Sequence, residues 1–193
     1  MNQVLVNRPV LEEYIRRQYP GFKLISSTTK RITGLDGLLE ELNKDYFLVV
    51  LDYDLNHNEE VLSAIGKQAD KVEILVNEIC YPGCPKRSEH YRQQSQMQLE
   101  YDIDAAFPCP NKTRERKFEE CKERPSFISR EQIREYADRG FVNFKIVGRG
   151  MPMDFVKESY LYYLVKDDSR AFIRNKMEST LNQFAQAMRK RKA

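Results

Sequence analysis

The sequence predicts an α/β fold built on a parallel sheet. Short apolar runs alternate along the chain with stretches of helical periodicity, and this β-α-β-α order is typical of parallel sheets. The run Tyr46–Leu51 (YFLVVL) is apolar throughout, as expected of a strand that is buried on both faces. We count five such strands, which fit either an open sheet or part of a (β/α)₈ barrel.

The elements follow in order from local signals. The predicted strands are Gln3–Val6, Phe22–Ser26, Tyr46–Leu51, Val72–Val76 and Val142–Val147. The first helix is expected to begin near Pro9, whose fixed φ suits a first turn, and to end at Pro20-Gly21. Further helices are expected over Leu35–Leu42, Glu59–Gln68 and Arg130–Arg139, and over most of the chain beyond Asp154. Ser129 is the expected N-cap of the helix at Arg130, and Gly140 its stop.

Composition excludes several classes of protein. The 193 residues carry 32 Lys and Arg against 29 Asp and Glu, so the net charge is only +3 and there is no strong signal for DNA binding. No window approaches 18 consecutive apolar residues, which argues against a membrane partner. The first residues, MNQVLVNRPVLEEYIRRQ, show no signal-peptide pattern, and we therefore expect a cytoplasmic protein.

Polar residues follow every predicted strand. In parallel α/β architectures, functional residues gather beyond the carboxyl ends of the strands. These residues are Asn7-Arg8, Ser27-Thr28, Asp52 with Asp54 and Asn56, Asn77-Glu78, and Gly148-Arg149. They provide the carboxylates, amides, hydroxyls and guanidiniums that a pocket for a polar or anionic ligand needs. The alternative is that strands simply end in polar turns. Asn77-Glu78 and Arg149 stand out because each follows a strongly apolar strand.

Four cysteines form the most distinctive pattern in the chain. They are Cys80, Cys84, Cys109 and Cys121, with the spacing C-x3-C-x24-C-x11-C. In a reducing compartment this number of cysteines favours metal binding or catalysis over disulfides. Thiolate ligands suit iron–sulfur clusters and zinc. The spacing differs from that of a zinc ribbon, and four free, buried cysteines remain an alternative.

The sequence predicts different environments for the two histidines. His90 lies six residues after Cys84 and is a candidate ligand, acid–base group or orienting partner of the site, or an ordinary structural histidine. His57 lies in the polar loop DLNHNEE and is expected to be exposed. No Ser-His-Asp order, phosphate-binding glycine loop or HExxH helix occurs in the sequence.

Two segments carry a resemblance to a known family. The segments EILVNEICYPGCPKRSEHY and FISREQIREYADRGFVNFKIVGRG, with Cys109 and Cys121, resemble the carboxyl-terminal part of the collagenase-like peptidase family U-thirty-two. This family includes ubiquinone-biosynthesis and RNA-hydroxylation proteins. The resemblance covers about residues 1–165 and is most specific in VNE-x-C-x3-CP-x-R-x2-H and FKIVGR. It implies a TIM-type barrel and, as in several branches of the family, a [4Fe–4S] cluster.

The resemblance also implies roles for individual residues. The cluster ligands would be Cys80, Cys84, Cys109 and Cys121, with zinc as the alternative metal. The pocket candidates implied by the resemblance are Glu78, His90, Lys145 and Arg149 as a catalytic set, with Asn77 and Arg87 as substrate-binding residues. Asp52 and Ser27 join the substrate-binding set because they follow predicted strands. Residues 1–165 would form a partial barrel with a cysteine-bearing excursion at about 80–124, and residues 166–193 a helical extension.

Two departures from the family pattern matter. The five predicted strands correspond to the last five of eight, and such an arc cannot close a barrel. A partner subunit or a second copy of the chain is therefore expected to complete it, unless the chain is truncated or its carboxyl-terminal helices cover the gap. Secondly, no nucleophile–base pair or zinc-protease motif supports peptidase activity.

Three functions are therefore compared. The first is an iron–sulfur enzyme, or the cluster-bearing subunit of one, that modifies a polar substrate such as a small molecule or an RNA base by hydroxylation-type chemistry. The second is a peptidase acting on peptides, as the family name implies. The third is a non-catalytic binding module in which the cysteines hold zinc.

Overall fold

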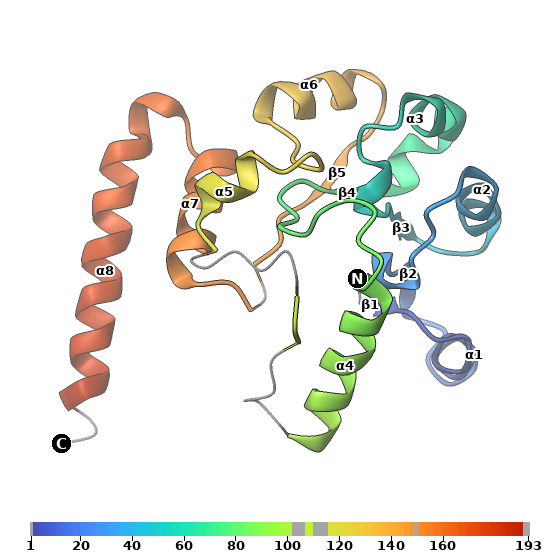
Figure 1. The fold of residues 1–193 in the computed structure, drawn as a ribbon, viewed down its shortest axis with the longest axis horizontal. Coiled ribbons are helices and arrows are strands. Elements are labelled where there is room, and N and C mark those ends of the chain that lie inside the picture. Colours follow the sequence, from blue (N-terminus) through green and yellow to red (C-terminus); the bar gives the residue numbers. More distant parts are fainter. Residues whose placement is uncertain (1, 102–106, 110–115, 149, 191–193) are drawn as a thin grey trace.

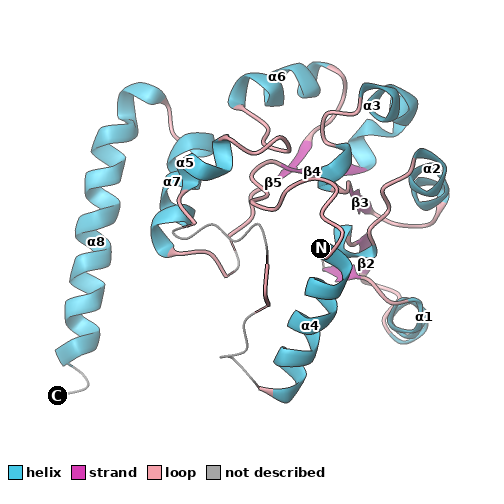
Figure 2. Ribbon diagram, in the orientation of Figure 1, coloured by secondary structure: helices cyan, strands magenta, loops and turns pink. Residues whose placement is uncertain are grey.

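The structure is a computed structural model that describes residues 2–101, 107–109, 116–148 and 150–190. One sheet holds its five strands, all parallel and in chain order (Figures 1 and 2). The strands are β1 (Gln3–Val6), β2 (Lys23–Ser26), β3 (Leu48–Val50), β4 (Val72–Leu75) and β5 (Asn143–Lys145). The predicted α/β class with a parallel, partial-barrel sheet is thus confirmed, and β1 and β5 are the two edges of the sheet.

Helices connect the strands and lie mostly along the outer side of the arc that the strands form in Figure 2. They are α1 (Pro9–Gln18), α2 (Leu35–Asn43), α3 (Glu59–Ile65), α4 (Arg87–Glu100), α5 (Phe118–Lys122), α6 (Arg130–Asp138), α7 (Met153–Leu164) and α8 (Arg170–Lys190). Four short 3₁₀ turns lie at Thr28–Lys30, Tyr53–Leu55, Gly66–Lys71 and Asp167–Ser169. The sequence predicts most of these elements to within a few residues.

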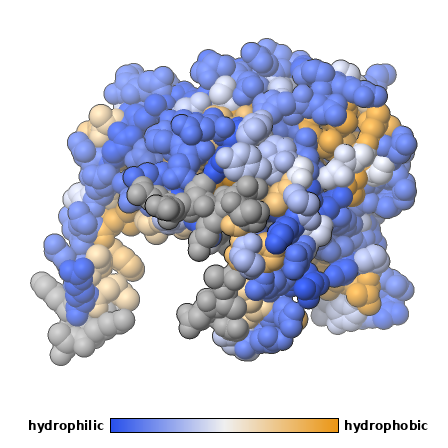
Figure 3. Space-filling model, viewed as in Figure 1, coloured by the Kyte–Doolittle hydropathy of each residue, from blue (hydrophilic) through white to orange (hydrophobic). Residues whose placement is uncertain are grey.

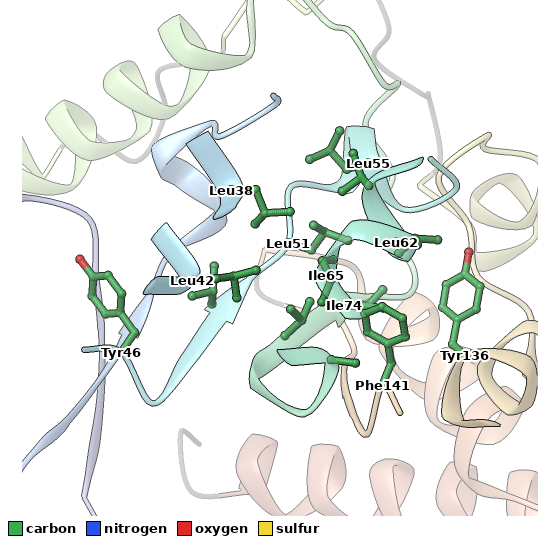
Figure 4. Close-up of a cluster of buried hydrophobic side chains, with 14 of the residues drawn as sticks. Leu38, Leu42, Tyr46, Leu51, Leu55, Leu62, Ile65, Ile74, Tyr136 and Phe141 are labelled. Atoms are coloured by element: carbon green, nitrogen blue, oxygen red, sulfur yellow. The ribbon is translucent and has the colours of Figure 1, made fainter. Parts of the chain in front are cut away.

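The main core lies between the strands and the helices that cover their outer face. Alternate strand residues such as Val49 and Ile74 point to this side and pack against helical residues that include Leu38 and Ile65 (Figure 4). Each of these four side chains is at most 2% exposed, and burial of such side chains contributes roughly 1.5–3 kcal/mol each. This two-layer packing fixes where each strand ends, and therefore where the loops that follow are placed.

The intervening strand residues form a second, smaller cluster on the opposite face of the sheet. Ile25, Leu48, Val50 and Leu75 are buried there, with Val147 packed against them. The period-2 alternation of a strand divides its side chains between the two clusters. At the edge strand the same face is less covered, since Leu5 is 48% exposed.

Two elements end earlier than the sequence suggests. Helix α3 stops at Ile65 instead of Gln68 because Gly66 takes φ +52°, from which the chain continues as a 3₁₀ turn. The strand predicted over Tyr46–Leu51 is shortened to β3. Tyr46 precedes it, and its backbone N–H donates to the Lys44 carbonyl at 2.9 Å instead of to a neighbouring strand. Its hydroxyl belongs to a polar cluster around Lys30.

The carboxyl-terminal part forms an antiparallel pair of helices. Helix α7 is joined to α8 by ion pairs of Glu158 with Arg174 at 2.8 Å and of Lys157 with Glu178 at 2.9 Å. In Figure 1, α8 extends past the end of α7 and away from the strands. Within the described residues, no helix is both long and apolar enough to cross a membrane.

Candidate functional site

The candidate site is formed by the loops that follow β2, β3 and β4. Its best-defined feature is Arg31, which lies in the left-handed region at φ 58° directly after the 3₁₀ turn beyond β2. One nitrogen of Arg31 donates to both carboxylate oxygens of Asp52, at 2.6 and 2.7 Å, and another donates to Asp54 at 2.6 Å. A single guanidinium therefore links the carboxyl ends of β2 and β3.

Asp52 is almost completely buried at the end of β3. Its side chain is 1% exposed, and burial raises the pKa of its carboxyl to about 6, although the backbone N–H of Asp54 and the charge of Arg31 oppose the rise. A carboxyl that titrates near neutral pH at a strand end is a frequent property of functional sites. The structure thus gives the predicted substrate-binding residue Asp52 an electrostatic environment suited to proton exchange.

A second guanidinium, that of Arg87, lies at the beginning of α4. It donates to Glu78 at 3.1 Å, and it lies over the rings of Tyr53 and Tyr91 at 5.2 and 4.3 Å from their centroids. Arg31 lies 5.2 Å from the centroid of the same Tyr53 ring. Glu78 and Arg87, predicted as catalytic and substrate-binding residues, are therefore in contact, and Tyr53 joins them to the Asp52–Arg31 pair.

Several buried polar atoms near these loops have no hydrogen-bond partner among the described residues. Following β2 and β3 these are Thr28 Oγ1, Tyr53 Oη, Asp54 Oδ1 and Asn56 Oδ1. The others are Arg87 Nε, Glu120 Oε2, Arg124 Nε and Ser126 Oγ. Buried polar groups are nearly always paired, and unpaired ones concentrate where water, an ion or a ligand supplies the partner. These atoms lie after the strands, on α4 and around α5, close to the predicted site residues.

Two of the cysteines contact Glu78. The backbone N–H of Cys80 donates to a Glu78 carboxylate oxygen at 3.0 Å, and the Cys121 thiol lies 3.7 Å from the Glu78 carbonyl oxygen. Burial raises the pKa of both thiols, that of Cys121 to about 12. Cys84 is close enough to Cys80 for its charge to raise the Cys80 pKa further. Three of the four predicted ligands thus gather around one short segment.

Packing explains how Cys121 reaches that segment from 43 residues beyond Glu78. Helix α5 places Phe118 against Phe155 and Tyr163 of α7, with ring centroids 5.9 and 6.2 Å apart. Phe118, Cys121 and Phe155 form a separate buried cluster. This aromatic contact holds α5 beside the end of β4, and Cys121 with it.

Cys109 is less connected to the other thiols. Its backbone N–H donates to the carbonyl of Phe107, whose ring stacks on His90 of α4 with centroids 4.5 Å apart. Burial and the nearby charges of Arg87 and Arg116 lower the pKa of His90. Among the described residues, no three His, Cys, Asp or Glu side chains converge as a finished metal site. The four thiols suit an iron–sulfur cluster or zinc in their chemistry, but in the described part of this structure they are not gathered into a site for either.

The other predicted site residues are placed as follows. The Asn77 amide is 0% exposed and bonds to both the N–H and the carbonyl of Val147, at 2.6 and 3.0 Å, so it extends the ladder between β4 and β5. Ser27 caps the turn at Thr28–Lys30. Lys145 pairs with Glu73 at 2.8 Å, on a strand rather than in the loops. Arg149 lies outside the described residues. His57 is exposed, as predicted.

Sequence reasoning missed Arg31, Tyr53 and Tyr91. Arg31 lies in the polar run STTKR after β2, where its charge gives no sign of which carboxylates it meets. Tyr53 lies between the two aspartates that Arg31 binds, so the pattern D-Y-D at a strand end is the signal that was available. Tyr91 follows His90 directly, in a helix whose apolar periodicity is too weak to indicate which residues face the site.

Comparison with known proteins gives one distant likeness. Among curated proteins, the chain is similar to one named an uncharacterized protease, from Methanocaldococcus jannaschii, at 26% identity over 170 residues. The alignment covers 85% of this chain and 49% of that protein, so the chain spans about half the length of the relative it matches. No protein-family profile matches the chain, and no solved structure matches it. The likeness to a protein named as a protease agrees, at a distance, with the resemblance found in the sequence.

Proposed function

We propose that this chain is an iron–sulfur protein of the collagenase-like peptidase type, with Cys80, Cys84, Cys109 and Cys121 as cluster ligands. The observation that carries the proposal is the contact of the Cys121 thiol with the Glu78 carbonyl oxygen at 3.7 Å, two residues before Cys80. This contact brings Cys121, which lies 41 residues after Cys80 in the sequence, to the segment that carries Cys80, and all four thiols are free. Such a cluster, when bound, supplies electron transfer or holds a further cofactor.

The substrate would be a polar molecule bound beside the cysteines. Arg87 Nε offers a hydrogen-bond donor and Asp54 Oδ1 an acceptor, both buried and without a partner among the described residues. The Tyr53 hydroxyl lies beside the Cys80 thiol. Glu78 is held by Arg87 within this group, and burial raises the pKa of Asp52 to about 6. These residues would orient the substrate and move its protons, in keeping with the hydroxylation-type chemistry that the family resemblance implies.

Peptidase activity is the second candidate function. It is favoured by the printed name of the archaeal relative. Burial raises the pKa of Cys80 and Cys121, whereas a catalytic thiol nucleophile needs a lowered pKa. Cleavage of casein or gelatin by purified chain that is free of metal would favour the peptidase. Absence of cleavage by chain with full iron content would favour the iron–sulfur function.

A zinc-binding, non-catalytic module is separated from both by metal analysis. The chain is to be purified without oxygen and assayed for iron, acid-labile sulfide and zinc. About four iron and four sulfide per chain are expected for a [4Fe–4S] cluster. About one zinc with no sulfide would support the zinc module instead.

The cysteine assignment is tested by Cys121→Ser and Cys84→Ser, with Ser88→Ala as the matched control. Ser88 lies on the exposed side of α4, one residue from Arg87. Each cysteine variant is expected to keep less than about a quarter of the wild-type iron, because a cluster is unstable with three thiolates and a hydroxyl. The control is expected to keep all of it. Unchanged iron in both cysteine variants would contradict the ligand assignment.

A further inference from the structure

The far half of α8 is an amphipathic helix without a partner in the described chain. Phe184 is 65% exposed and Met188 41% exposed, on the same face as Met177 and Leu181. Helix α7 runs alongside α8 only as far as Leu181, which lies beside Met153 at the first turn of α7. The residues of α8 beyond Leu181 therefore project past the body (Figure 1).

An apolar groove lies where α7 and α8 meet. It has a volume of about 300 Å³ and is lined by Met153, Val156, Tyr160, Met177 and Leu181, with Lys157, Lys176 and Thr180 at its sides. Met153 and Tyr160 are 61% and 44% exposed, so the groove is open to an incoming helix. Figure 3 shows apolar side chains along the projecting part of α8, on the side that faces the body in this view.

We propose that α8 pairs with α8 of a second copy of this chain, and that the projecting half of each helix lies in the α7–α8 groove of the other. Each copy carries both a groove and a projecting half of α8. A two-fold axis between two copies therefore places each projecting half in the groove of the other copy, so the surface is self-complementary. The lengths also agree. Nine residues follow Leu181 in α8 and span about 13 Å at 1.5 Å per residue. The 12 residues of α7, which border the groove, span about 18 Å, so the projecting half fits along them.

Charge favours a second copy over another occupant. From Asn182 onwards the sequence has no acidic residue and ends in Arg189-Lys190-Arg191-Lys192. One side of the groove carries the carboxylates of Asp154, Glu158 and Glu178 against two cations, Lys157 and Arg174; the side chains of Asp154 and Glu178 are 89% and 45% exposed. That side therefore has a net charge of −1, while Lys176 lies on the other. The antiparallel arrangement places the cationic end of each α8 along the acidic side of its partner's groove.

The test is the mass of the purified full chain in solution, measured by sedimentation velocity and light scattering. The wild-type chain is expected to be a dimer at about 10–100 µM, the range in which interfaces of modest size associate. Phe184→Glu and Met153→Glu alter the two halves of the contact and are each expected to weaken the dimer about 10-fold or more. Both positions are exposed, so neither change should affect folding.

Gln186→Glu is the matched control, since it adds the same charge on the opposite, exposed face of α8. It is expected to leave the dimer intact. A wild-type chain that is monomeric in solution would overturn the proposal. A monomer that sediments with anionic phospholipid vesicles would overturn it as well. A dimer that survives both Phe184→Glu and Met153→Glu would also overturn it. The proposed dimer does not depend on the iron–sulfur cluster, and the variant Cys121→Ser is therefore expected to remain dimeric.

Discussion

At the scale of single residues, Arg31 holds the site together. Its guanidinium meets Asp52 and Asp54 from the next strand, and both carboxylates are largely buried, with side chains 1% and 13% exposed. Removal of one partner from a buried ion pair leaves the other charge without compensation. Arg31 therefore stabilises the fold by compensating these carboxylates, and it also lies beside the Tyr53 ring.

Arg31→Ala is expected to lower the free energy of unfolding by about 2–4 kcal/mol, because it strands the buried carboxyl of Asp52. Arg16→Ala is the control, since Arg16 pairs with an Asp45 side chain that is 98% exposed. Exposed pairs contribute about 0–1 kcal/mol. Urea unfolding of both variants measures the difference. Equal losses of unfolding free energy would show that Arg31 does not stabilise the two loops more than an exposed ion pair does.

The buried cluster around Lys30 makes stability depend on acid pH. Burial alone would raise the pKa of Glu41, but hydrogen bonds from Lys30, Lys44 and Ser26 outweigh it and lower the pKa from 4.5 to about 2. A lowered folded pKa gives stability that is present above pH 4.5 and lost as the pH falls toward 2. Glu41→Gln is therefore expected to flatten the pH dependence of unfolding between pH 4.5 and 2.

Glu40→Gln is the neighbouring control. Glu40 also contacts Lys44, but its side chain is 74% exposed. Its removal should leave the slope of stability against pH within error of the wild type. A wild-type slope that persists in Glu41→Gln would mean that another carboxyl is responsible for acid unfolding.

At the scale of elements, helix α6 shows how local sequence sets a boundary. The Ser129 hydroxyl accepts from the backbone N–H of Gln132, and the Gln132 side chain accepts from the backbone N–H of Ser129, which completes a capping box. Ser129 was predicted as the N-cap from its residue type and position alone, and the structure confirms it. The helix then positions Tyr136, whose hydroxyl donates to the carbonyl of Asn56 at 2.7 Å in the loop after β3.

Ser129→Ala is expected to cost about 1 kcal/mol of unfolding free energy, because the first turn of α6 loses a partner for its N–H groups. Ser63→Ala, at an exposed position inside α3, is the control and should be neutral or slightly stabilising. Thermal and urea unfolding provide the measurement. A cost that is the same for the two serines would contradict the capping role.

Helix α4 shows where element prediction ends. It spans Arg87–Glu100 and has no buried residue, so the sequence there has no apolar stripe from which a helix could be predicted. Its first turn nevertheless carries Arg87 and His90, both of which face the site, since Arg87 meets Glu78 and His90 stacks on Phe107. The sequence predicted a cysteine-bearing excursion at about 80–124 here, and the structure shows a solvated helix of 14 residues within it.

At the scale of the whole molecule, the sheet could be predicted because its signals are local. Each strand is a short apolar run, each connection contains a helix, and right-handed crossovers leave the carboxyl ends on one side. The gathering of the site could be predicted only in outline. Strand order places Asp52 and Glu78 on the same side, but the contacts of Arg31, the stacking of Arg87 on Tyr53 and the aromatic packing that carries Cys121 are long-range.

The two free edges of the sheet bear on assembly. Strands β1 and β5 each pair with a single neighbour. The expectation that a partner subunit or a second copy adds strands to them stays a prediction. The pairing proposed for α8 is separate from it, because α8 lies beyond α7 and contacts neither edge strand closely (Figure 1).

The central claim is that the thiols near Glu78 bind one iron–sulfur cluster. X-ray absorption at the iron edge of anaerobically purified chain tests it most directly. The claim predicts a first shell of sulfur alone at about 2.3 Å, with a second shell of neighbouring iron atoms, and loss of both in Cys121→Ser. A first shell of oxygen or nitrogen, or a bound metal that is zinc with no iron, would contradict it.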